Sequence, residues 1–168
     1  YSTSENSKST NIKPSLAKDN LNINTNRKLW IYDSFAGLPD KTPEDASGAG
    51  ANFQAGELLV TKREVVAKIR KHGLQNVVIK KAWFSDLTSQ DLPAQIAFAF
   101  CDGDLYSSIK ISLQLVLPRL SKRGIIVVHD YNNPDLPGSS RAVDEFLRSH
   151  PQYRLQVRYT LAILSKEC

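Results

Sequence analysis

The 168-residue chain is predicted to form an α/β domain built on a mostly parallel sheet, and three observations predict this fold class. Short runs of consecutive apolar residues recur along the chain, as strands covered on both faces require. Helical patterns separate several of these runs, which indicates parallel strands joined by crossover helices that cover both faces of the sheet. The last two apolar segments lie too close together for a crossover helix, so they predict an antiparallel hairpin at the sheet edge.

The strands are expected from residue 28 onward. Residues 1–27 are rich in Ser, Asn, Thr and Lys and are expected to form an irregular N-terminal arm, so the α/β domain is expected to span residues 28–168. The expected parallel strands are Leu29–Tyr32, Val77–Ile79, Ile96–Phe100 and Ile125–Val128, and the expected hairpin strands are Tyr153–Tyr159 and Leu161–Leu164.

Three helices are expected between these strands. Thr61 and Glu64 have the spacing of a capping box, which marks the start of the first helix. The second covers Ser107–Leu117, whose many apolar residues indicate tight packing on the sheet, and Pro118 is expected to end it. The segment Ala142–Leu147 is the centre of a third helix.

Composition and charge argue against several classes of partner. The chain has 22 Lys and Arg against 17 Asp and Glu, but the basic residues are scattered and lack the interleaved aromatic residues of a nucleic-acid surface. No apolar run approaches the ~20 residues of a membrane span, and the N-terminus has no apolar stretch typical of a signal peptide. The two cysteines do not form a disulfide framework. We therefore expect a cytoplasmic protein without a nucleic-acid or membrane partner.

Chemically active side chains follow three of the predicted strands. Asp33 follows the first strand, Asp102 and Asp104 follow the third, and the pair His129 and Asp130 follows the fourth. Because ligands of an open α/β sheet bind beyond the carboxyl ends of the strands, we expect these side chains to share one rim. A single acid in such a place is more commonly a helix N-cap, but three strands together favour a binding site.

These residues suit different roles. Asp33 is placed to accept hydrogen bonds from ribose hydroxyls. Asp102, His129 and Asp130 are candidates for a divalent ion, since carboxylates suit Mg²⁺ while an imidazole shifts the preference toward Mn²⁺, Fe²⁺ or Zn²⁺. The alternative for His129 is a partly buried ring bonded to a backbone carbonyl. Asp104 is expected to cap the helix that begins near Ser107.

Aromatic residues follow the remaining strand at the same rim. A flat adenine could pack against Trp83 or Phe84, with Ser85 or Asp86 holding its edge. The alternative is that both rings are lid or core residues. Residues 33–56 are expected to form a long irregular loop above the sheet, and loops of this length are often functional.

Five motifs, in this order, closely resemble those of the macrocin O-methyltransferase family. They are Trp30–Pro39, Ala82–Phe84, Asp102–Ser108, His129–Tyr131 and Ala142–Phe146. Members of that family are S-adenosylmethionine-dependent enzymes that methylate sugar hydroxyls of macrolides and related natural products, assisted by Mg²⁺. The resemblance covers about residues 28–146 and implies a Rossmann-like methyltransferase fold.

The resemblance implies which residues bind the metal and which residue takes the proton from the acceptor hydroxyl. Asp102, His129 and Asp130 would occupy the metal-ligand positions, with Mg²⁺ or Mn²⁺ as the ion. Asp102 would also be the catalytic residue that helps to take the proton from the acceptor hydroxyl. The family usually has Asp where this chain has His129, so we expect the metal to differ, to bind weakly or to be absent.

The resemblance also implies the cofactor contacts. Asp33, with the adjacent Ser34, would bind the adenosine ribose of S-adenosylmethionine, and Trp83 to Asp86 would surround its adenine. The family's usual glycine before the Trp-Phe pair is Ala82 here. The partner would be a small hydroxylated acceptor.

The family's first strand and its glycine-rich cofactor turn are missing, because the first glycine of this chain is Gly37. Without a central strand, a parallel sheet keeps two free strand edges, which favours pairing into a homo-oligomer. Either residues 1–27 fill this position in an unusual way, another chain does so, or the chain is a fragment of a longer enzyme. The alternative function is therefore a non-catalytic or truncated methyltransferase-like domain that serves in binding or interaction.

Overall fold

The computed structural model describes residues 27–46 and 53–166. The N-terminal arm expected over residues 1–27 lies outside these ranges except for its last residue, as do six residues of the long loop. Among the described residues, no helix is both long enough and apolar enough to cross a membrane.

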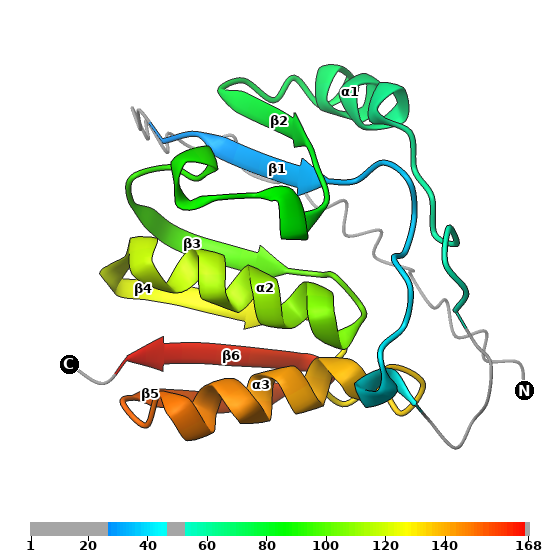
Figure 1. The fold of residues 1–168 in the computed structure, drawn as a ribbon. Coiled ribbons are helices and arrows are strands. Elements are labelled where there is room, and N and C mark those ends of the chain that lie inside the picture. The colour runs from blue at the N-terminus through cyan, green and yellow to red at the C-terminus, as the bar shows by residue number, and fades with distance from the viewer. Residues whose placement is uncertain (1–26, 47–52, 167–168) are drawn as a thin grey trace, which may run out of the picture.

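The described chain alternates strands and helices until its C-terminal hairpin (Figure 1). In chain order the elements are β1 (Leu29–Asp33), α1 (Lys62–Lys71), β2 (Val77–Lys81), β3 (Ile96–Cys101), α2 (Tyr106–Val116), β4 (Leu120–Val128), α3 (Pro137–Ser149), β5 (Tyr153–Arg158) and β6 (Leu161–Lys166). Four short 3-10 helices lie between them: η1 (Pro43–Asp45), η2 (Phe84–Asp86), η3 (Ser89–Asp91) and η4 (Leu117–Arg119).

The strands form two sheets. β1 and β2 pair in parallel, and a four-stranded sheet has the order β3-β4-β6-β5. Within it β3 and β4 are parallel, whereas β6 is antiparallel to both β4 and β5. The predicted α/β fold and C-terminal antiparallel hairpin are therefore confirmed.

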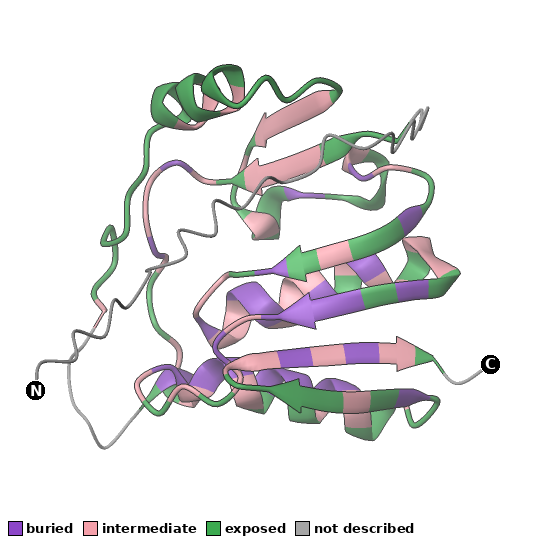
Figure 2. Ribbon diagram, turned by 180° about the vertical axis from the view of Figure 1, so that it is seen from behind, coloured by how far each residue is buried: buried purple, intermediate pink, exposed green. Residues whose placement is uncertain are grey.

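β1 and β3 are end strands of their sheets and are not hydrogen-bonded to each other. Both views show β1 and β3 pointing the same way (Figures 1 and 2). Among the described strands none pairs with either edge. The possibility that residues 1–27 occupy this position concerns residues that, apart from Arg27, lie outside the described ranges.

In the part of the chain that the structure describes, helices cover one face of the four-stranded sheet. Figures 1 and 2 place α2 and α3 together on one side of it, and they bury Ile109 and Val143 against Ile126. On the opposite face Phe98 and Phe100 of β3 are 60% and 51% exposed. Helices were expected on both faces of the sheet, and the described residues place helices on one face of this four-stranded sheet.

The sequence signals set most element boundaries. At the start of α1, Thr61 Oγ1 accepts a hydrogen bond from the Glu64 N–H, and the Glu64 carboxylate accepts one from the Thr61 N–H, as a capping box requires. Pro118 ends α2 by turning the chain into η4. The third helix begins earlier than expected, because Pro137 occupies its first turn, where a missing N–H is tolerated.

Candidate active site

The carboxyl ends of β1, β2, β3 and β4 lie at one edge of the molecule (Figure 1). A pocket at this edge brings together six of the acidic, hydroxyl and aromatic residues singled out from the sequence, and its lining also includes glycines and apolar loop residues. The six are Asp33, Ser34, Trp83, Phe84, Asp102 and Asp104. Segments far apart in the chain therefore converge on one rim.

Asp33 and Ser34 shape the turn that leaves β1. The Asp33 side chain is exposed, and its Oδ1 accepts a hydrogen bond of 2.6 Å from the Phe35 N–H. Ser34 Oγ accepts from the Ala36 N–H at 3.1 Å and donates to the Gly37 carbonyl at 3.2 Å. The turn holds the Asp33 carboxylate at the rim, where its second oxygen points to no described donor.

Gly37 allows the two arms of the long loop to meet. Its φ of +81° favours glycine, and a Cβ there would overlap the carbonyls of Gly56 and Glu57. The neighbouring Leu38 exchanges two backbone hydrogen bonds of 2.9 Å with these same residues. Leu38 and Leu58, which belong to opposite arms, both line the pocket.

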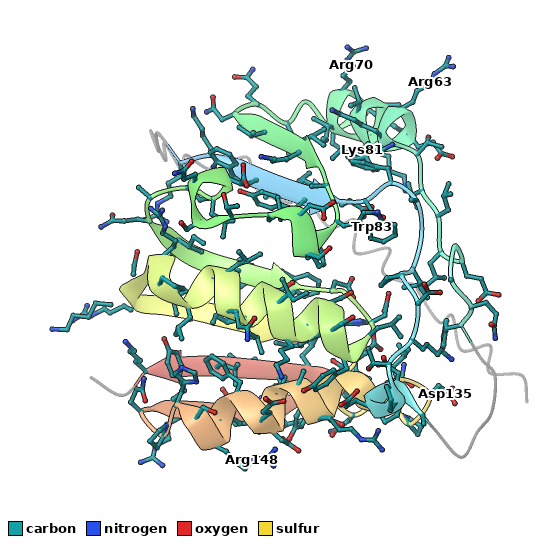
Figure 3. The ribbon with its side chains drawn as sticks, viewed as in Figure 1. Arg63, Arg70, Lys81, Trp83, Asp135 and Arg148 are labelled. Atoms are coloured by element: carbon teal, nitrogen blue, oxygen red, sulfur yellow. The ribbon has the colours of Figure 1, made fainter. Side chains whose placement is uncertain are left out.

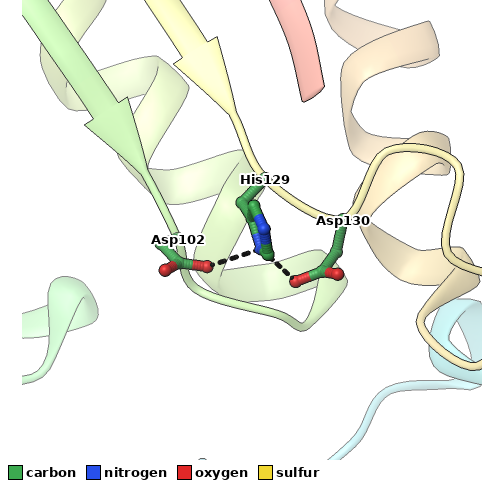
Figure 4. A group of neighbouring side chains, drawn as sticks. All are labelled: Asp102, His129 and Asp130. Atoms are coloured by element: carbon green, nitrogen blue, oxygen red, sulfur yellow. Dashed lines mark hydrogen bonds and ion pairs between the residues drawn. The ribbon is translucent and has the colours of Figure 1, made fainter. Parts of the chain in front are cut away.

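Asp102, His129 and Asp130 form a compact cluster next to the pocket (Figure 4). His129 Nδ1 lies 2.6 Å from Asp130 Oδ2 and 3.2 Å from Asp102 Oδ1. The ring nitrogen thus faces two carboxylates, rather than the backbone carbonyl considered as an alternative from the sequence. The Ser139 hydroxyl donates to the His129 carbonyl at 2.7 Å, and Asn133 Nδ2 donates to the other Asp130 oxygen at 2.9 Å.

The shared negative charge perturbs the acids and the imidazole. Burial raises the pKa of Asp102, an effect that His129 opposes and Asp130 reinforces. Burial, followed by the charges of Asp102 and Asp130, raises the pKa of Asp104 to about 6. Burial on its own lowers the pKa of His129, but the hydrogen bond and charge of Asp130, with the other acids, outweigh it and raise the pKa.

Asp104 does not cap α2, so this expectation is wrong. The N-cap of α2 is Leu105, which makes no side-chain cap bond. Asp104 has a φ of +58°, a left-handed conformation that turns its carboxylate toward Asp130 instead. The cap comes from Asp45 of η1, whose Oδ1 accepts a 2.7 Å hydrogen bond from the Tyr106 N–H.

The segment after β2 divides into pocket and surface residues. Trp83 and Phe84 line the pocket, and Figure 3 shows Trp83 beside the carboxyl end of β2. Trp83 is 37% exposed, which leaves one part of its ring available to a ligand. Ser85 and Asp86 are exposed, do not line the pocket, and contact each other at 3.4 Å.

Sequence reasoning missed three features of the site. Asp45 lies in a Thr-x-x-Asp pattern that marks a capping box, yet its link to α2 spans 61 positions and leaves no local signal. Gly103 is a close-approach glycine, since a Cβ would lie 2.7 Å from Ser108 Cβ and 3.3 Å from Phe84. Leu58 lines the pocket from a segment without a motif.

Among the described residues, no Lys or Arg lines the pocket. Figure 3 shows Arg63 and Arg70 projecting outward from α1, while Arg148 projects from α3 at the opposite end of the molecule. The positive net charge is therefore spread over separate elements.

The donor set fits a divalent cation. One ligand atom from each of Asp102, His129 and Asp130 lies within 4.8 Å of the others, so a single ion can reach all three. Two carboxylate oxygens and one imidazole nitrogen suit Mn²⁺ as well as Mg²⁺.

The residues at the pocket fit only part of S-adenosylmethionine. Asp33 and the aromatic pair Trp83 and Phe84 suit its adenosine half. The pocket volume, however, is only about 100 Å³, below the ~300 Å³ of a typical small-molecule site.

Comparison with known proteins shows a family and several enzymes that the chain is similar to. The model of the macrocin-O-methyltransferase (TylF) family matches residues 13–154. The 8-demethyl-8-(2,3-dimethoxy-alpha-L-rhamnosyl)-tetracenomycin-C 4'-O-methyltransferase of Streptomyces olivaceus is 30% identical over 113 residues, which are 64% of this chain and 43% of that protein. The demethyldecarbamoylnovobiocin O-methyltransferase of Streptomyces niveus is 30% identical over 125 residues, which are 71% of this chain and 47% of that protein. The chain thus spans less than half the length of these relatives.

Solved structures show the same fold. The O-methyltransferase NovP matches with a TM-score of 0.73 and 26% identity, covering 87% of this chain and 62% of that chain. The calicheamicin methyltransferase CalS11 matches with a TM-score of 0.66 and 24% identity, covering 83% of this chain and 60% of that chain. The Rossmann-like methyltransferase fold implied by the sequence motifs is therefore confirmed.

Proposed function

The chain belongs to the macrocin-O-methyltransferase family. From this we propose that it takes part in the transfer of a methyl group from S-adenosylmethionine to a hydroxyl of a small molecule. In this proposal the reaction takes place in the cytoplasm and a divalent metal assists it. The observation that carries the proposal is the convergence of Asp33 and Asp102, from two separate sheets, on one pocket. Acids at neighbouring strand ends are the arrangement in which a nucleoside ligand and a reacting hydroxyl can be held side by side.

The residues at the end of β1 and after β2 would hold the adenosine. The exposed Asp33 carboxylate keeps one oxygen for its own turn and presents the other to the ribose hydroxyls. Trp83 offers a partly exposed ring for the adenine, while Gly103 lets the backbone after β3 approach closely. The cofactor would supply its methyl group from a sulfonium centre, which is electrophilic without activation by the protein.

The acidic cluster after β3 and β4 would bind the metal and accept the proton of the acceptor hydroxyl. A divalent ion held by Asp102, His129 and Asp130 would lower the pKa of the acceptor hydroxyl and fix its orientation. Asp102 is the most exposed member of this cluster, with 49% of its side chain accessible, and it also lines the pocket. Its carboxylate is therefore the group we propose to accept the hydroxyl proton.

Apolar residues at the rim favour an acceptor with an apolar body. Leu58, Leu59 and Val60 are 58%, 53% and 42% exposed, and Leu58 lines the pocket near Trp83. Such a surface suits a hydroxyl carried by a natural product that is largely apolar. Demethyldecarbamoylnovobiocin, the acceptor named for one relative, is a suitable probe of this class.

Titration calorimetry with S-adenosylmethionine tests the cofactor assignment. We expect binding to the chain to be weakened by about tenfold in Asp33→Asn, because the amide keeps the turn acceptor but presents an NH₂ group to the ribose. Asp135→Asn, in the β4–α3 connection outside the pocket lining, is the matched control and should bind as the unchanged chain does. Equal affinities for all three proteins, or no binding with Mg²⁺ or Mn²⁺ present, would contradict the proposal.

Metal binding is tested separately from turnover. We expect Mn²⁺, followed by electron paramagnetic resonance, to bind the chain and to be lost in Asp130→Asn. His129→Asp should raise the affinity for Mg²⁺ relative to Mn²⁺, because it replaces a nitrogen donor by an oxygen donor. Unaltered Mn²⁺ binding in Asp130→Asn would remove this cluster from the proposed mechanism.

A further inference from the structure

We propose that Tyr159, in the turn between β5 and β6, is a specificity residue that contacts the acceptor molecule beside the cluster of Asp102, His129 and Asp130. The assignment rests on the proposed function, because it needs an acceptor whose hydroxyl reaches that cluster. The match to the family model ends at residue 154, so it assigns no role to this turn.

The sheet topology brings the turn to the edge where the cluster lies. β6 runs antiparallel to β4, and Val128 at the end of β4 pairs with Ala162 near the start of β6 (Figure 1). Only Tyr159 and Thr160 lie between β5 and β6. In the strand order β3-β4-β6-β5, this turn therefore comes directly after the two strand ends that carry the cluster.

Two hydrogen bonds hold the turn against the segment that follows β4. The Thr160 carbonyl accepts one from the Tyr131 N–H at 2.8 Å, and this N–H belongs to the peptide bond that follows Asp130. The Tyr159 carbonyl accepts another from Asn132 Nδ2 at 3.2 Å. The position of the turn is thus coupled to that of a proposed metal ligand, on the side of β4 away from β3.

Tyr159 adopts a backbone conformation that its residue type disfavours. Its φ is +54°, in the left-handed region where a Cβ crowds the following carbonyl oxygen and where bulky residues are rare. Two-residue hairpin turns with positive φ favour Asn, Asp or Gly. Packing offsets little of this strain, because 94% of the residue is exposed. Strained residues of this kind cluster at ligand-binding sites.

The other bulky left-handed residues support this interpretation. Among the described residues they are Phe35, Phe53 and Leu58. Phe35 is buried and Phe53 packs against a buried cluster, so packing holds both in place. Leu58 is 58% exposed, as Tyr159 is 94% exposed, and Leu58 lines the pocket. The exposed members of this group therefore lie at the rim, where a bound molecule can cover them.

The tyrosine side chain suits a cyclic acceptor. It combines a flat apolar ring with a hydroxyl that can donate or accept a hydrogen bond. With adenosine in the pocket beside Asp33 and Trp83, an acceptor that presents its hydroxyl to Asp102 has room on the side of β6. There its own ring would pack against Tyr159.

Titration calorimetry with demethyldecarbamoylnovobiocin, in the presence of S-adenosylmethionine and Mn²⁺, tests the proposal. Tyr159→Asn removes the ring and tolerates the left-handed backbone. We therefore expect its melting temperature to rise by about 2–4 °C while its affinity for the acceptor falls by about tenfold. Tyr159→Phe keeps both the ring and the strain, and should retain most of the affinity and the original melting temperature.

A purely structural role for Tyr159 predicts a different result. The more stable Tyr159→Asn variant would then bind the acceptor as well as the unchanged chain does, and that outcome would overturn the proposal. Leu74→Asn is the matched control, since it removes an apolar side chain that is 51% exposed ahead of β2, at the opposite edge of the sheet. It should leave the affinity for the acceptor unchanged.

Binding of the cofactor and the metal separates this proposal from the proposed function. Both affinities should be unaltered in Tyr159→Asn, and an equal loss of S-adenosylmethionine affinity would overturn a role specific to the acceptor. A chain that binds S-adenosylmethionine and Mn²⁺ but not the acceptor would overturn the role of Tyr159 and leave the other assignments standing. Failure of the unchanged chain to bind either one would contradict the proposed function, and this assignment with it.

Discussion

Replacing Asp45 by alanine tests how the site loop is anchored to the helices. The Asp45 side chain is 4% exposed and accepts three hydrogen bonds, from the Tyr106 N–H at 2.7 Å, the Thr42 N–H at 2.8 Å and the Thr42 hydroxyl at 2.9 Å. The first of these caps α2, an element that lies 61 residues further along the chain. Asp45→Ala leaves that helix terminus without its acceptor.

The expected loss follows from these contacts. A buried donor left without a partner costs about 1–3 kcal/mol, the loss of an N-cap about 1 kcal/mol, and the loss of a negative charge at a helix N-terminus about 0.3–1 kcal/mol. These effects overlap, so we expect the free energy of unfolding to fall by about 3 kcal/mol. For a chain of this size that lowers the melting temperature by about 6–12 °C.

Urea and thermal unfolding, followed by circular dichroism, measure this loss. Asp40→Ala, an exposed acid in the same loop, is the matched control and should change stability by less than about 0.5 kcal/mol. Asp45→Asn keeps an acceptor oxygen and should fall between the two. A loss below about 1 kcal/mol in Asp45→Ala, or equal losses in Asp45→Ala and Asp40→Ala, would refute the assignment of Asp45 as the cap of α2.

Three further substitutions test other parts of the molecule. Gly138→Ala should lower the unfolding free energy by about 1–3 kcal/mol in a urea titration, because its methyl group would overlap Asp45 Oδ1. Tyr32→Phe should cost about 1 kcal/mol in the same assay, since it removes the 2.9 Å bond from the hydroxyl to the Asp91 carbonyl of η3; no loss would mean that this bond does not stabilise the fold. Asp104 has its pKa raised from 3.8 to about 6, so the folded state holds the proton more tightly and stability should decline as pH rises through that window. Asp104→Asn should show a smaller decline between about pH 4 and 6 in melting temperatures, and an unchanged pH profile would contradict the assignment.

Features with a local cause were visible in the sequence. The four parallel strands begin or end within a few residues of their expected limits, except that β4 starts at Leu120, where it pairs irregularly with Ile96. Thr61 and Glu64 form the predicted capping box. The shared rim of Asp33 and Asp102 followed from the rule that parallel strands bring their carboxyl ends to one edge.

Features that depend on distant contacts were not visible. The expected cap from Asp104 was wrong because a left-handed backbone turns it away, and Asp45 occupies that position from another element. Likewise, an apolar run such as Ile96–Cys101 indicates a strand buried on both faces, but the run carries no information on which neighbour covers each face. The roles of Ser85 and Asp86 toward adenine stay predictions, since both lie outside the pocket lining.

The absence of a described hydrogen-bond ladder between β1 and β3 has a dynamic consequence. The β1–β2 pair is tethered to the rest by side chains, such as Tyr32 on the Asp91 carbonyl and Lys80 on the Asp91 carboxylate, and by the loop that Asp45 fastens to α2. A unit that the described residues hold by side chains and one loop should open before the four-stranded sheet melts. The separation between Asp33 and Asp102, and with it the geometry offered to a nucleoside, is therefore expected to fluctuate.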